Sequence, residues 1–250
     1  MTVRGRDDIK SAYRDESRAG AYIATRFDDP LGAELHRRQV QLINRAVRQV
    51  QPGAMLEIAC GPARLTPELE YVRTSVAVEQ SPSMLLHARE RLQELGRTHW
   101  RLVQGDAFEL PFPDKSFDMV VTYRFLRHFD RADRGRLLRE IRRVLRPRGG
   151  LIFDVAHASA YKWLLGKWGV AGSWVDDYWF ERDEFVAEMR DEQLQVETLH
   201  AVHSLLHVQH YLFSYVHPRL PWLATPISRA MTALCPWDAY EWVAMCRSGS

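Results

Sequence analysis

The sequence predicts an α/β protein built on a doubly wound sheet of mostly parallel strands. Two observations support this fold: short apolar runs alternate with helix-like segments, and signals that start and stop helices lie between the runs. Strands that alternate with helices are joined by right-handed crossovers, which make neighbouring strands parallel. The runs expected to form strands span residues 54–58, 75–79, 100–104, 117–122 and 150–155.

The helices are expected from their periodicity and their end signals. Residues 34–50 carry apolar side chains near helical spacing, and the Pro-Gly pair at 52–53 stops that helix. Ser81 and Pro82 are typical of a helix start, with Ser81 as the N-cap, and Gly96 ends the segment. The expected helices span residues 34–50, 82–95 and 131–146.

Beyond residue 155 the composition changes. Seven of the eight tryptophans lie there. They either form a second core of large side chains or line an aromatic acceptor pocket, and the sequence leaves both interpretations open. Residues 239–246 have the apolar character of a final strand.

Charge and cysteine content limit the partners and the compartment. Arg and Lys total 34 against 32 Asp and Glu, and a net charge of +2 argues against a nucleic-acid partner. Three scattered cysteines, Cys60, Cys235 and Cys246, predict a reducing compartment. The first 20 residues lack a signal-peptide core, and no run approaches the roughly 18 apolar residues of a membrane span. We therefore expect a soluble cytoplasmic protein without a membrane partner.

The segment MLEIACGPARLT, residues 55–66, carries the strongest chemical signal. An apolar strand here contains Glu57 near its end and continues into a turn of small residues ahead of a helix. Small side chains let a ligand approach the backbone, and a helix N-terminus offers N–H groups to an anion. The spacing of Ala59, Gly61 and Ala63 differs from the G-x-G-x-x-G pattern of nicotinamide-binding proteins.

The order E-I-A-C-G-P-A, starting at Glu57, resembles motif I of the class I S-adenosylmethionine-dependent methyltransferases. Other segments agree in order and distance: a strand that ends in Glu79, a G-D-A turn at 105–107, and LPFPDKSFDMVVTYRFLRHF at 110–129. The last segment is similar to the loop and fourth strand of ubiquinone and menaquinone methyltransferases. The specific resemblance covers about residues 50–155.

This resemblance implies a Rossmann-like sheet of seven strands with helices on both faces and an antiparallel last strand. It also implies a single methyltransferase domain over residues 1–250. The expected parts are an N-terminal helical cover at 1–50, a cofactor-binding core at 51–155, a Trp-rich acceptor-site cap with the sixth strand at 156–238, and the last strand at 239–247.

The resemblance also implies a set of cofactor contacts. In this family the acidic residue that ends the second strand binds both ribose hydroxyls, and the one in the G-D-A turn accepts from the adenine amino group. Glu79 and Asp106 occupy these positions, and a carboxylate suits them because it accepts two hydrogen bonds at once. Alanine stands at 59 and 63, where glycine is usual in the family, and we expect cofactor binding to survive the change. The expected cofactor-binding residues are Tyr13, Tyr22, Glu57, Ala59, Gly61, Glu79, Gln80, Met84, Asp106, Ala107 and Tyr123.

Few protein groups are needed for methyl transfer, because the methyl carbon of a sulfonium is already electrophilic. Those that act on the acceptor are expected after the fourth strand, where Arg124 and His128 lie. His128, with an ordinary pKa of roughly 6.5, is either a general base or a structural side chain. Arg124 either binds an acidic acceptor or pairs with a carboxylate. Contacts to the acceptor are expected from Trp174, Trp179 and His207.

A series of histidines raises the question of a metal site. His200, His203, His207 and His210 recur at spacings of three, four and three. On one helix they would share a face and could bind a metal, whereas a strand would scatter them. Because no clustered carboxylates accompany them, we expect no metal.

These features predict S-adenosylmethionine-dependent methyl transfer to a small molecule, by O-, N- or C-methylation of a metabolite that is aromatic or hydrophobic. No Asn-Pro-Pro-Tyr-like tetrad follows the fourth strand, which argues against methylation of nucleobase amino groups. The alternatives are an RNA or protein methyltransferase and a module that binds the cofactor without catalysis.

Overall fold

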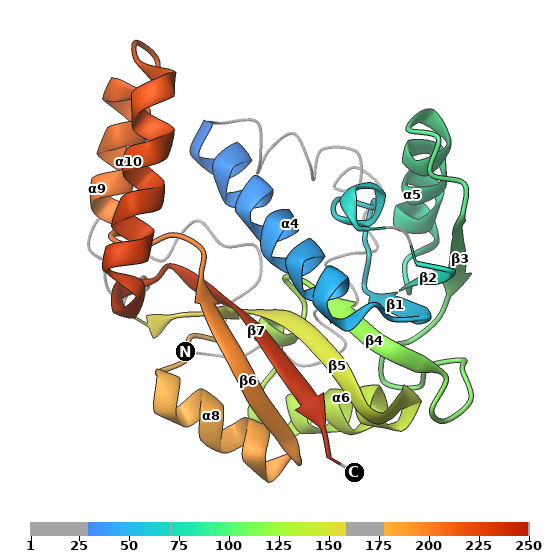
Figure 1. The fold of residues 1–250 in the computed structure, drawn as a ribbon. Coiled ribbons are helices and arrows are strands. Elements are labelled where there is room, and N and C mark those ends of the chain that lie inside the picture. The colour runs from blue at the N-terminus through green and yellow to red at the C-terminus, as the bar shows by residue number, and fades with distance from the viewer. Residues whose placement is uncertain (1–29, 71, 159–177, 250) are drawn as a thin grey trace.

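A seven-stranded sheet forms the centre of the computed structural model, which describes residues 30–70, 72–158 and 178–249 (Figure 1). Its strands are β1 (Ala54–Ile58), β2 (Thr74–Glu79), β3 (Trp100–Gln104), β4 (Phe117–Thr122), β5 (Leu145–Ala156), β6 (Leu194–Ala201) and β7 (Glu241–Ser248).

The strand order is β3-β2-β1-β4-β5-β7-β6. Neighbours from β3 to β5 are parallel, whereas β7 is antiparallel to both β5 and β6. The predicted doubly wound sheet with an antiparallel last strand is confirmed. Since the order reverses between β1 and β4, this is the point where ligands bind in open α/β sheets.

Helices cover both faces of the sheet. One face packs against α4 (Pro30–Val50) and α5 (Pro82–Glu94), and the other packs against α6 (Arg131–Val144) and α8 (Arg182–Asp191) (Figure 1). Each face therefore has its own apolar core. The remaining helical elements are η1 (Thr66–Glu68), η2 (Leu126–His128), α9 (Leu206–Tyr211), η3 (Leu212–Val216), α10 (Pro221–Leu234) and η4 (Pro236–Asp238).

The N-terminus of α5 forms as its sequence predicts. The Ser81 hydroxyl accepts a hydrogen bond from the Met84 N–H at 3.4 Å, and Pro82 occupies the first turn, where no N–H is needed. The helix begins directly after β2, so its first turn lies beside the carboxyl end of that strand.

The boundary between α6 and β5 differs from the prediction of a helix over 131–146. The helix ends at Val144, and Leu145 already belongs to β5, where it pairs with Phe117 of β4. The Ser116 N–H donates to the Val144 carbonyl at 2.8 Å. Strand pairing with a distant segment therefore overrides the helical pattern at this end. Among the other small differences, α4 begins at Pro30, β2 begins at Thr74, and β7 runs from Glu241 to Ser248.

The histidine series is divided among three elements. His200 lies in β6, His203 in the next loop, and His207 and His210 in α9. His203 is buried, which lowers its pKa to about 4, and its Nδ1 lies 2.5 Å from the Gln209 side-chain oxygen. Within residues 30–70, 72–158 and 178–249, no group of three or more His, Cys, Asp or Glu side chains could hold a metal ion.

Some expectations fall outside the described residues, namely those on Tyr13, Tyr22, Trp174 and the part of the Trp-rich segment at 159–177. The division into helical cover, core and cap therefore stays a prediction. No helix in the part of the chain that the structure describes is long and apolar enough to cross a bilayer.

Candidate cofactor site and active site

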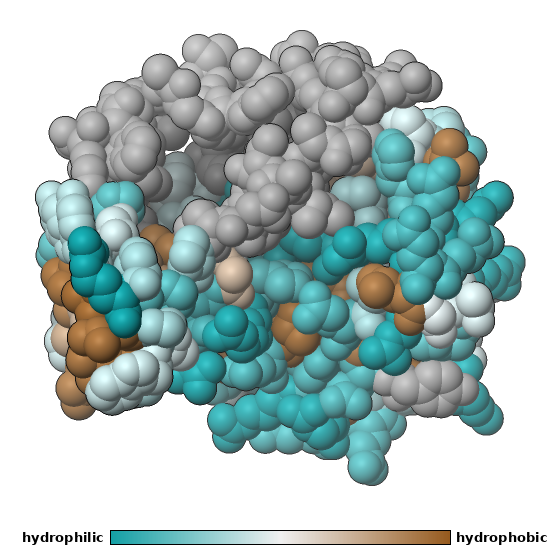
Figure 2. Space-filling model, turned by 90° about the horizontal axis from the view of Figure 1, so that it is seen from above, coloured by the Kyte–Doolittle hydropathy of each residue, from teal (hydrophilic) through white to brown (hydrophobic). Residues whose placement is uncertain are grey.

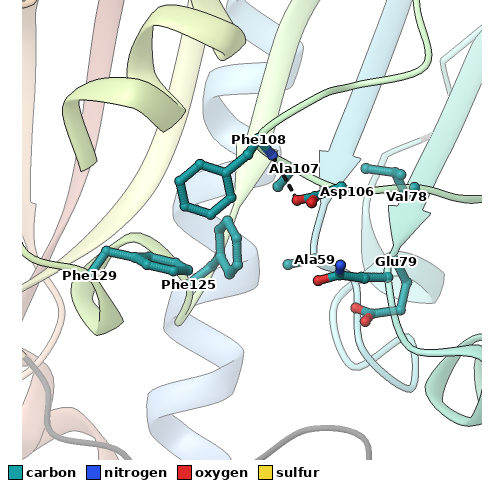
Figure 3. Close-up of a pocket in the computed structure, with 10 residues that line it drawn as sticks. Ala59, Val78, Glu79, Asp106, Ala107, Phe108, Phe125 and Phe129 are labelled. Atoms are coloured by element: carbon teal, nitrogen blue, oxygen red, sulfur yellow. Dashed lines mark hydrogen bonds between the residues drawn. The ribbon is translucent and has the colours of Figure 1, made fainter. Parts of the chain in front are cut away.

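A pocket lies at the carboxyl ends of β1, β2 and β3, where the strand order predicts a ligand site (Figure 3). The space within it is about 360 Å³, a volume that includes the part open to solvent. The residues that line it are Ala59, Val78, Glu79, Gln80, Gly105, Asp106, Ala107, Phe108, Phe125 and Phe129.

The turn after β1 has an unusual backbone. Ala59, Gly61 and Ala63 have φ values of 55°, 57° and 57°, all in the left-handed region that favours glycine. The two alanines thus keep a backbone shape that glycine would adopt without strain. The Gly61 N–H points to Glu79 and donates to its Oε2 at 3.0 Å, so the turn is tied to the end of β2.

Glu79 is held in place by backbone donors. Its Oε1 accepts from the Ser81 N–H at 2.8 Å, and its Oε2 accepts from Gly61. Burial raises the pKa of the carboxyl, and the hydrogen bonds from backbone N–H groups oppose that rise. An ionised carboxylate offers about four acceptor positions, so this oriented group keeps capacity to accept from a ligand hydroxyl.

The turn after β3 brings a second carboxylate to the pocket. The Oδ1 of Asp106 accepts from the Phe108 N–H at 3.0 Å, as the dashed line in Figure 3 shows. A Cβ on Gly105 would lie 2.9 Å from side-chain carbons of both Val78 and Pro111, so only glycine fits here without displacement. Asp106 and Glu79 thus line the same pocket and present two carboxylate acceptors to it.

An aromatic wall faces these carboxylates across the pocket (Figure 3). The ring centroid of Phe129 lies 5.3 Å from that of Phe108 and 5.0 Å from that of Phe125, and both pairs are edge to face. None of these three was expected from the sequence. The signal was present, since one aromatic residue directly follows the G-D-A turn and two follow β4.

The structure brings part of the expected cofactor set to this pocket. Ala59, Glu79, Gln80, Asp106 and Ala107 line it. The expected residues that do not line it are Glu57, Gly61, Met84 and Tyr123.

Glu57 is buried beneath the turn. Burial raises the pKa of its carboxyl to about 7, and the nearby Arg64 guanidinium opposes the rise. Glu79 contributes to the rise through repulsion between the two carboxylates.

A buried ion cluster, made of Arg127, Asp154 and Glu241, lies at the same edge of the sheet, over β4, β5 and β7. Because β7 is antiparallel, its first residue, Glu241, lies beside the end of β5. The Arg127 Nε is 3.3 Å from Asp154 Oδ2, and its Nη1 is 3.7 Å from Glu241 Oε2. All three side chains are at most 1% exposed.

Other polar side chains surround Glu241. Its Oε1 accepts from the Tyr123 hydroxyl at 2.5 Å and from the Gln39 amide of α4 at 2.6 Å. Arg64 in turn donates to the Gln39 oxygen at 2.9 Å. Burial and the neighbouring Asp154 raise the pKa of Glu241. Tyr123, expected at the cofactor, is instead bound to this carboxylate.

The two expected catalytic residues, Arg124 and His128, lie on either side of Arg127 in the sequence. Arg124 has a φ of 53°, and its N–H donates to Asp154 Oδ1 at 2.5 Å. His128 is 3% exposed, and its N–H donates to the Phe125 carbonyl at 3.1 Å. Neither side chain lines the pocket.

The two described acceptor candidates lie elsewhere. The ring of Trp179 packs against Tyr240, with centroids 6.4 Å apart, beside the start of β7. His207 is exposed in α9. The structure does not bring them together in the pocket described above.

Comparison with known proteins supplies the family. The profile of a family described as "Methyltransferase domain" matches residues 56–153, from β1 to β5. These residues are a class I S-adenosylmethionine-dependent methyltransferase domain. Its cofactor is S-adenosylmethionine, and the pocket lies within the matched segment.

Curated relatives of the methyltransferase domain act on different molecules. A demethylmenaquinone methyltransferase of Listeria welshimeri is 36% identical over 108 residues, which cover 41% of this chain and 45% of the relative. A malonyl-[acyl-carrier protein] O-methyltransferase of Legionella pneumophila is 28% identical over 129 residues, which cover 50% of this chain and 44% of the relative. The chain thus spans less than half the length of these two relatives.

A solved structure shares the fold of this chain. A 1,6-didemethyltoxoflavin-N1-methyltransferase of Burkholderia thailandensis, solved with 1,6-didemethyltoxoflavin and S-adenosylhomocysteine bound, has a TM-score of 0.63 at 15% identity. The match covers 100% of this chain and 93% of that one. At this identity the likeness concerns the fold alone.

Proposed function

We propose that the chain transfers the methyl group of S-adenosylmethionine to a small, hydrophobic or aromatic molecule. The observation that carries this proposal is the placement of Glu79 and Asp106 on one pocket, at the carboxyl ends of β2 and β3 and opposite an aromatic wall. The cofactor supplies an electrophilic methyl group when it is bound. The chain supplies binding, orientation and an enclosed acceptor site.

The proposed cofactor contacts divide the adenosine between two carboxylates. Glu79 accepts from the two ribose hydroxyls, since its backbone donors hold it rigid at the end of β2. Asp106 accepts from the adenine amino group, and Phe108 lies against the flat base. The left-handed turn at Ala59 and Gly61 gives the methionine end close access to the backbone.

The experiment that tests cofactor binding is isothermal titration with S-adenosylmethionine and S-adenosylhomocysteine, with NAD as a negative control. Glu79→Ala should weaken binding of both cofactor forms by about 1.5–3 kcal/mol, because it removes charged hydrogen bonds. Glu90→Ala, at an exposed position on α5, is the matched control and should leave affinity unchanged. Equal affinity of Glu79→Ala and the unmodified chain would contradict this assignment.

The proposed acceptor site lies beside the methyl group, in the segment that follows β4. His128 is proposed as the general base, and Arg124 as the group that orients an acidic acceptor; both follow β4 at the ligand-binding edge. His128→Ala should lower kcat by roughly 10²–10⁴-fold, with cofactor affinity retained. Unchanged rates at every pH would exclude His128 from the reaction.

Methyl transfer itself is tested by mass spectrometry of candidate acceptors incubated with the protein and cofactor. A product heavier by one methylene, formed together with S-adenosylhomocysteine, is expected. Binding of the cofactor without turnover across diverse metabolites, RNA and proteins would instead indicate a non-catalytic module.

We also propose that the protein works in the cytoplasm. All three cysteines are free; Cys60 and Cys246 are buried, and Cys235, which ends α10, is partly exposed. Unpaired thiols are typical of a reducing compartment.

A further inference from the structure

A helical hairpin stands at the β6 end of the sheet (Figure 1). We define the α9–α10 hairpin as residues 206–237, which include α9, η3, α10 and most of η4. In Figure 1 its two arms lie side by side, and its tip is the part farthest from the strands. The hairpin therefore presents a surface that the sheet does not cover.

The inner side of the hairpin has its own apolar core and its own buried hydrogen bonds. Leu212, Phe213 and Ala224 form a small apolar core of their own. The buried side chain of Gln209 contacts the hydroxyls of Thr232 at 3.2 Å and Ser228 at 2.6 Å, which joins the two arms. The outer side chains are thus not needed to hold the hairpin together.

The outer side of the hairpin is strongly apolar. In the described part of the chain ten large hydrophobic side chains are exposed, and eight of them lie in the hairpin; the other two, Leu86 and Leu95, are in or next to α5. Figure 2 shows the hydrophobic residues gathered on the side of the molecule where α9 and α10 lie. The eight are Val208, Tyr211, Tyr215, Leu220, Trp222, Ile227, Leu234 and Trp237.

Trp222, Leu234 and Trp237 are exposed to 72%, 72% and 70% of their maximum. Tyr211 and Tyr215 are also exposed, and their rings stack with centroids 6.0 Å apart. Isolated exposed hydrophobic residues need no explanation, but a gathered set marks an interaction surface.

The charge of the same segment identifies the partner. The chain has 32 acidic residues in 250, yet none lies between Glu197 and Asp238. Arg219 is exposed near the tip, between Tyr215 and Trp222 in the chain. The surface thus combines Trp, Tyr and Leu with an arginine and has no carboxylate to repel anions. This combination is typical of helices that lie in the interface of a bilayer.

We propose that the α9–α10 hairpin binds the surface of a bilayer that contains anionic lipids. Tyr215, Leu220 and Trp222 enter the interface between headgroups and acyl chains, and Arg219 contacts the phosphates. Trp and Tyr suit this depth because each has an apolar ring and a polar tip. The chain lies on the membrane through this hairpin and does not span it there. The proposal therefore departs from the sequence expectation of a protein without a membrane partner.

Surface binding brings a methyltransferase to acceptors dissolved in the bilayer. The association itself requires neither cofactor nor acceptor, because none of the eight residues lines the cofactor pocket. A test of membrane binding therefore succeeds or fails independently of the proposed reaction.

The experiment is co-sedimentation of the full chain with phosphatidylcholine vesicles, with and without phosphatidylglycerol. Binding to the vesicles that contain phosphatidylglycerol, weakened by added salt, is expected. The double variant Tyr215→Ser, Trp222→Ser should bind those vesicles at least about tenfold more weakly, since the apolar burial of both rings is lost. Leu86→Ser with Leu95→Ser is the matched control on α5 and should bind like the unmodified chain.

A second pair of variants tests the charge without touching the apolar residues. Arg219→Glu should weaken binding to phosphatidylglycerol vesicles, whereas Arg97→Glu, just beyond α5, should not. Circular dichroism confirms that each variant keeps its fold.

Failure of the unmodified chain to bind these vesicles would overturn the proposal, and so would equal losses in the hairpin and α5 variants. A second copy of this chain is the competing partner for this surface. Sedimentation equilibrium measures whether the chain forms such a dimer. A dimer that Trp222→Ser dissociates would assign the surface to self-association and overturn lipid binding.

Discussion

The two halves of the ligand-binding edge of the sheet are built in opposite ways. Over β1, β2 and β3, backbone N–H groups and small residues surround an open pocket, and Glu79 is held by backbone donors alone. Over β4, β5 and β7, one guanidinium and two carboxylates are enclosed together. The pocket over β1, β2 and β3 can exchange a ligand. Removing any one side chain of the ion cluster would instead leave an uncompensated buried charge. The ion cluster is therefore best understood as the support that fixes η2, whose flanking Phe125 and Phe129 line the pocket.

The largest effect is expected from breaking the ion cluster. Arg127→Met removes the cation between Asp154 and Glu241 and leaves their buried carboxylates uncompensated, which should cost about 3–5 kcal/mol of unfolding free energy. Urea denaturation measures this loss. Arg131→Met is the control, since Arg131 and Asp191 are 62% and 61% exposed, and an exposed ion pair contributes only about 0–1 kcal/mol. Similar losses of unfolding free energy in both variants would show that burial does not determine how much the ion cluster contributes to stability.

A smaller effect concerns the carboxyl beneath the turn. The pKa of Glu57 is about 7 in the folded chain against a usual 4.5, so the folded state holds its proton more tightly. This group therefore lowers stability as pH rises from about 4.5 to 7, by on the order of 3 kcal/mol. Glu57→Gln should remove that loss and make the chain more stable than the unmodified protein at pH 8.

Urea denaturation at a series of pH values checks this expectation as a difference between the two proteins. Other buried groups cancel in that difference, including His203, whose lowered pKa makes the fold less stable below about pH 6.5. A constant difference across the series would mean that Glu57 keeps its ordinary pKa.

The smallest effect is expected in the turn. Ala59→Gly relieves a left-handed backbone and should raise stability by about 0.5–1 kcal/mol after the added flexibility of the unfolded chain is subtracted. Ala63→Gly is the comparison, because Ala63 has the same backbone shape but is fully buried, so the lost methyl offsets the relief. Thermal unfolding distinguishes the two; destabilisation by Ala59→Gly would show that the turn is not strained.

The same contrast explains which parts of the site the sequence predicts. Glu79, Gln80, Asp106 and Ala107 stand at strand ends inside short contiguous motifs, so their common edge follows from the order of strands. The ion cluster joins residues that are far apart in the chain, and Gln39 meets Glu241 across 202 positions. No local pattern carries such a contact.

The position of Tyr123 illustrates the same limit. It stands at the end of β4, where a cofactor contact was expected, and the structure directs its hydroxyl to Glu241 instead. The end of α6 is similar, since Leu145 leaves the helical pattern because Phe117 pairs with it. In both cases a partner distant in sequence decides the outcome.

The burial of the cysteines has a practical consequence for studying the hairpin. The thiolate is the reactive form of cysteine, and burial raises the pKa of Cys246 to about 12 and that of Cys60 well above its usual range. Cys235 is the partly exposed thiol, directly after Leu234 and two positions before Trp237. A maleimide fluorophore added to the folded native chain should therefore attach at this one site and report lipid contact by a change in its emission.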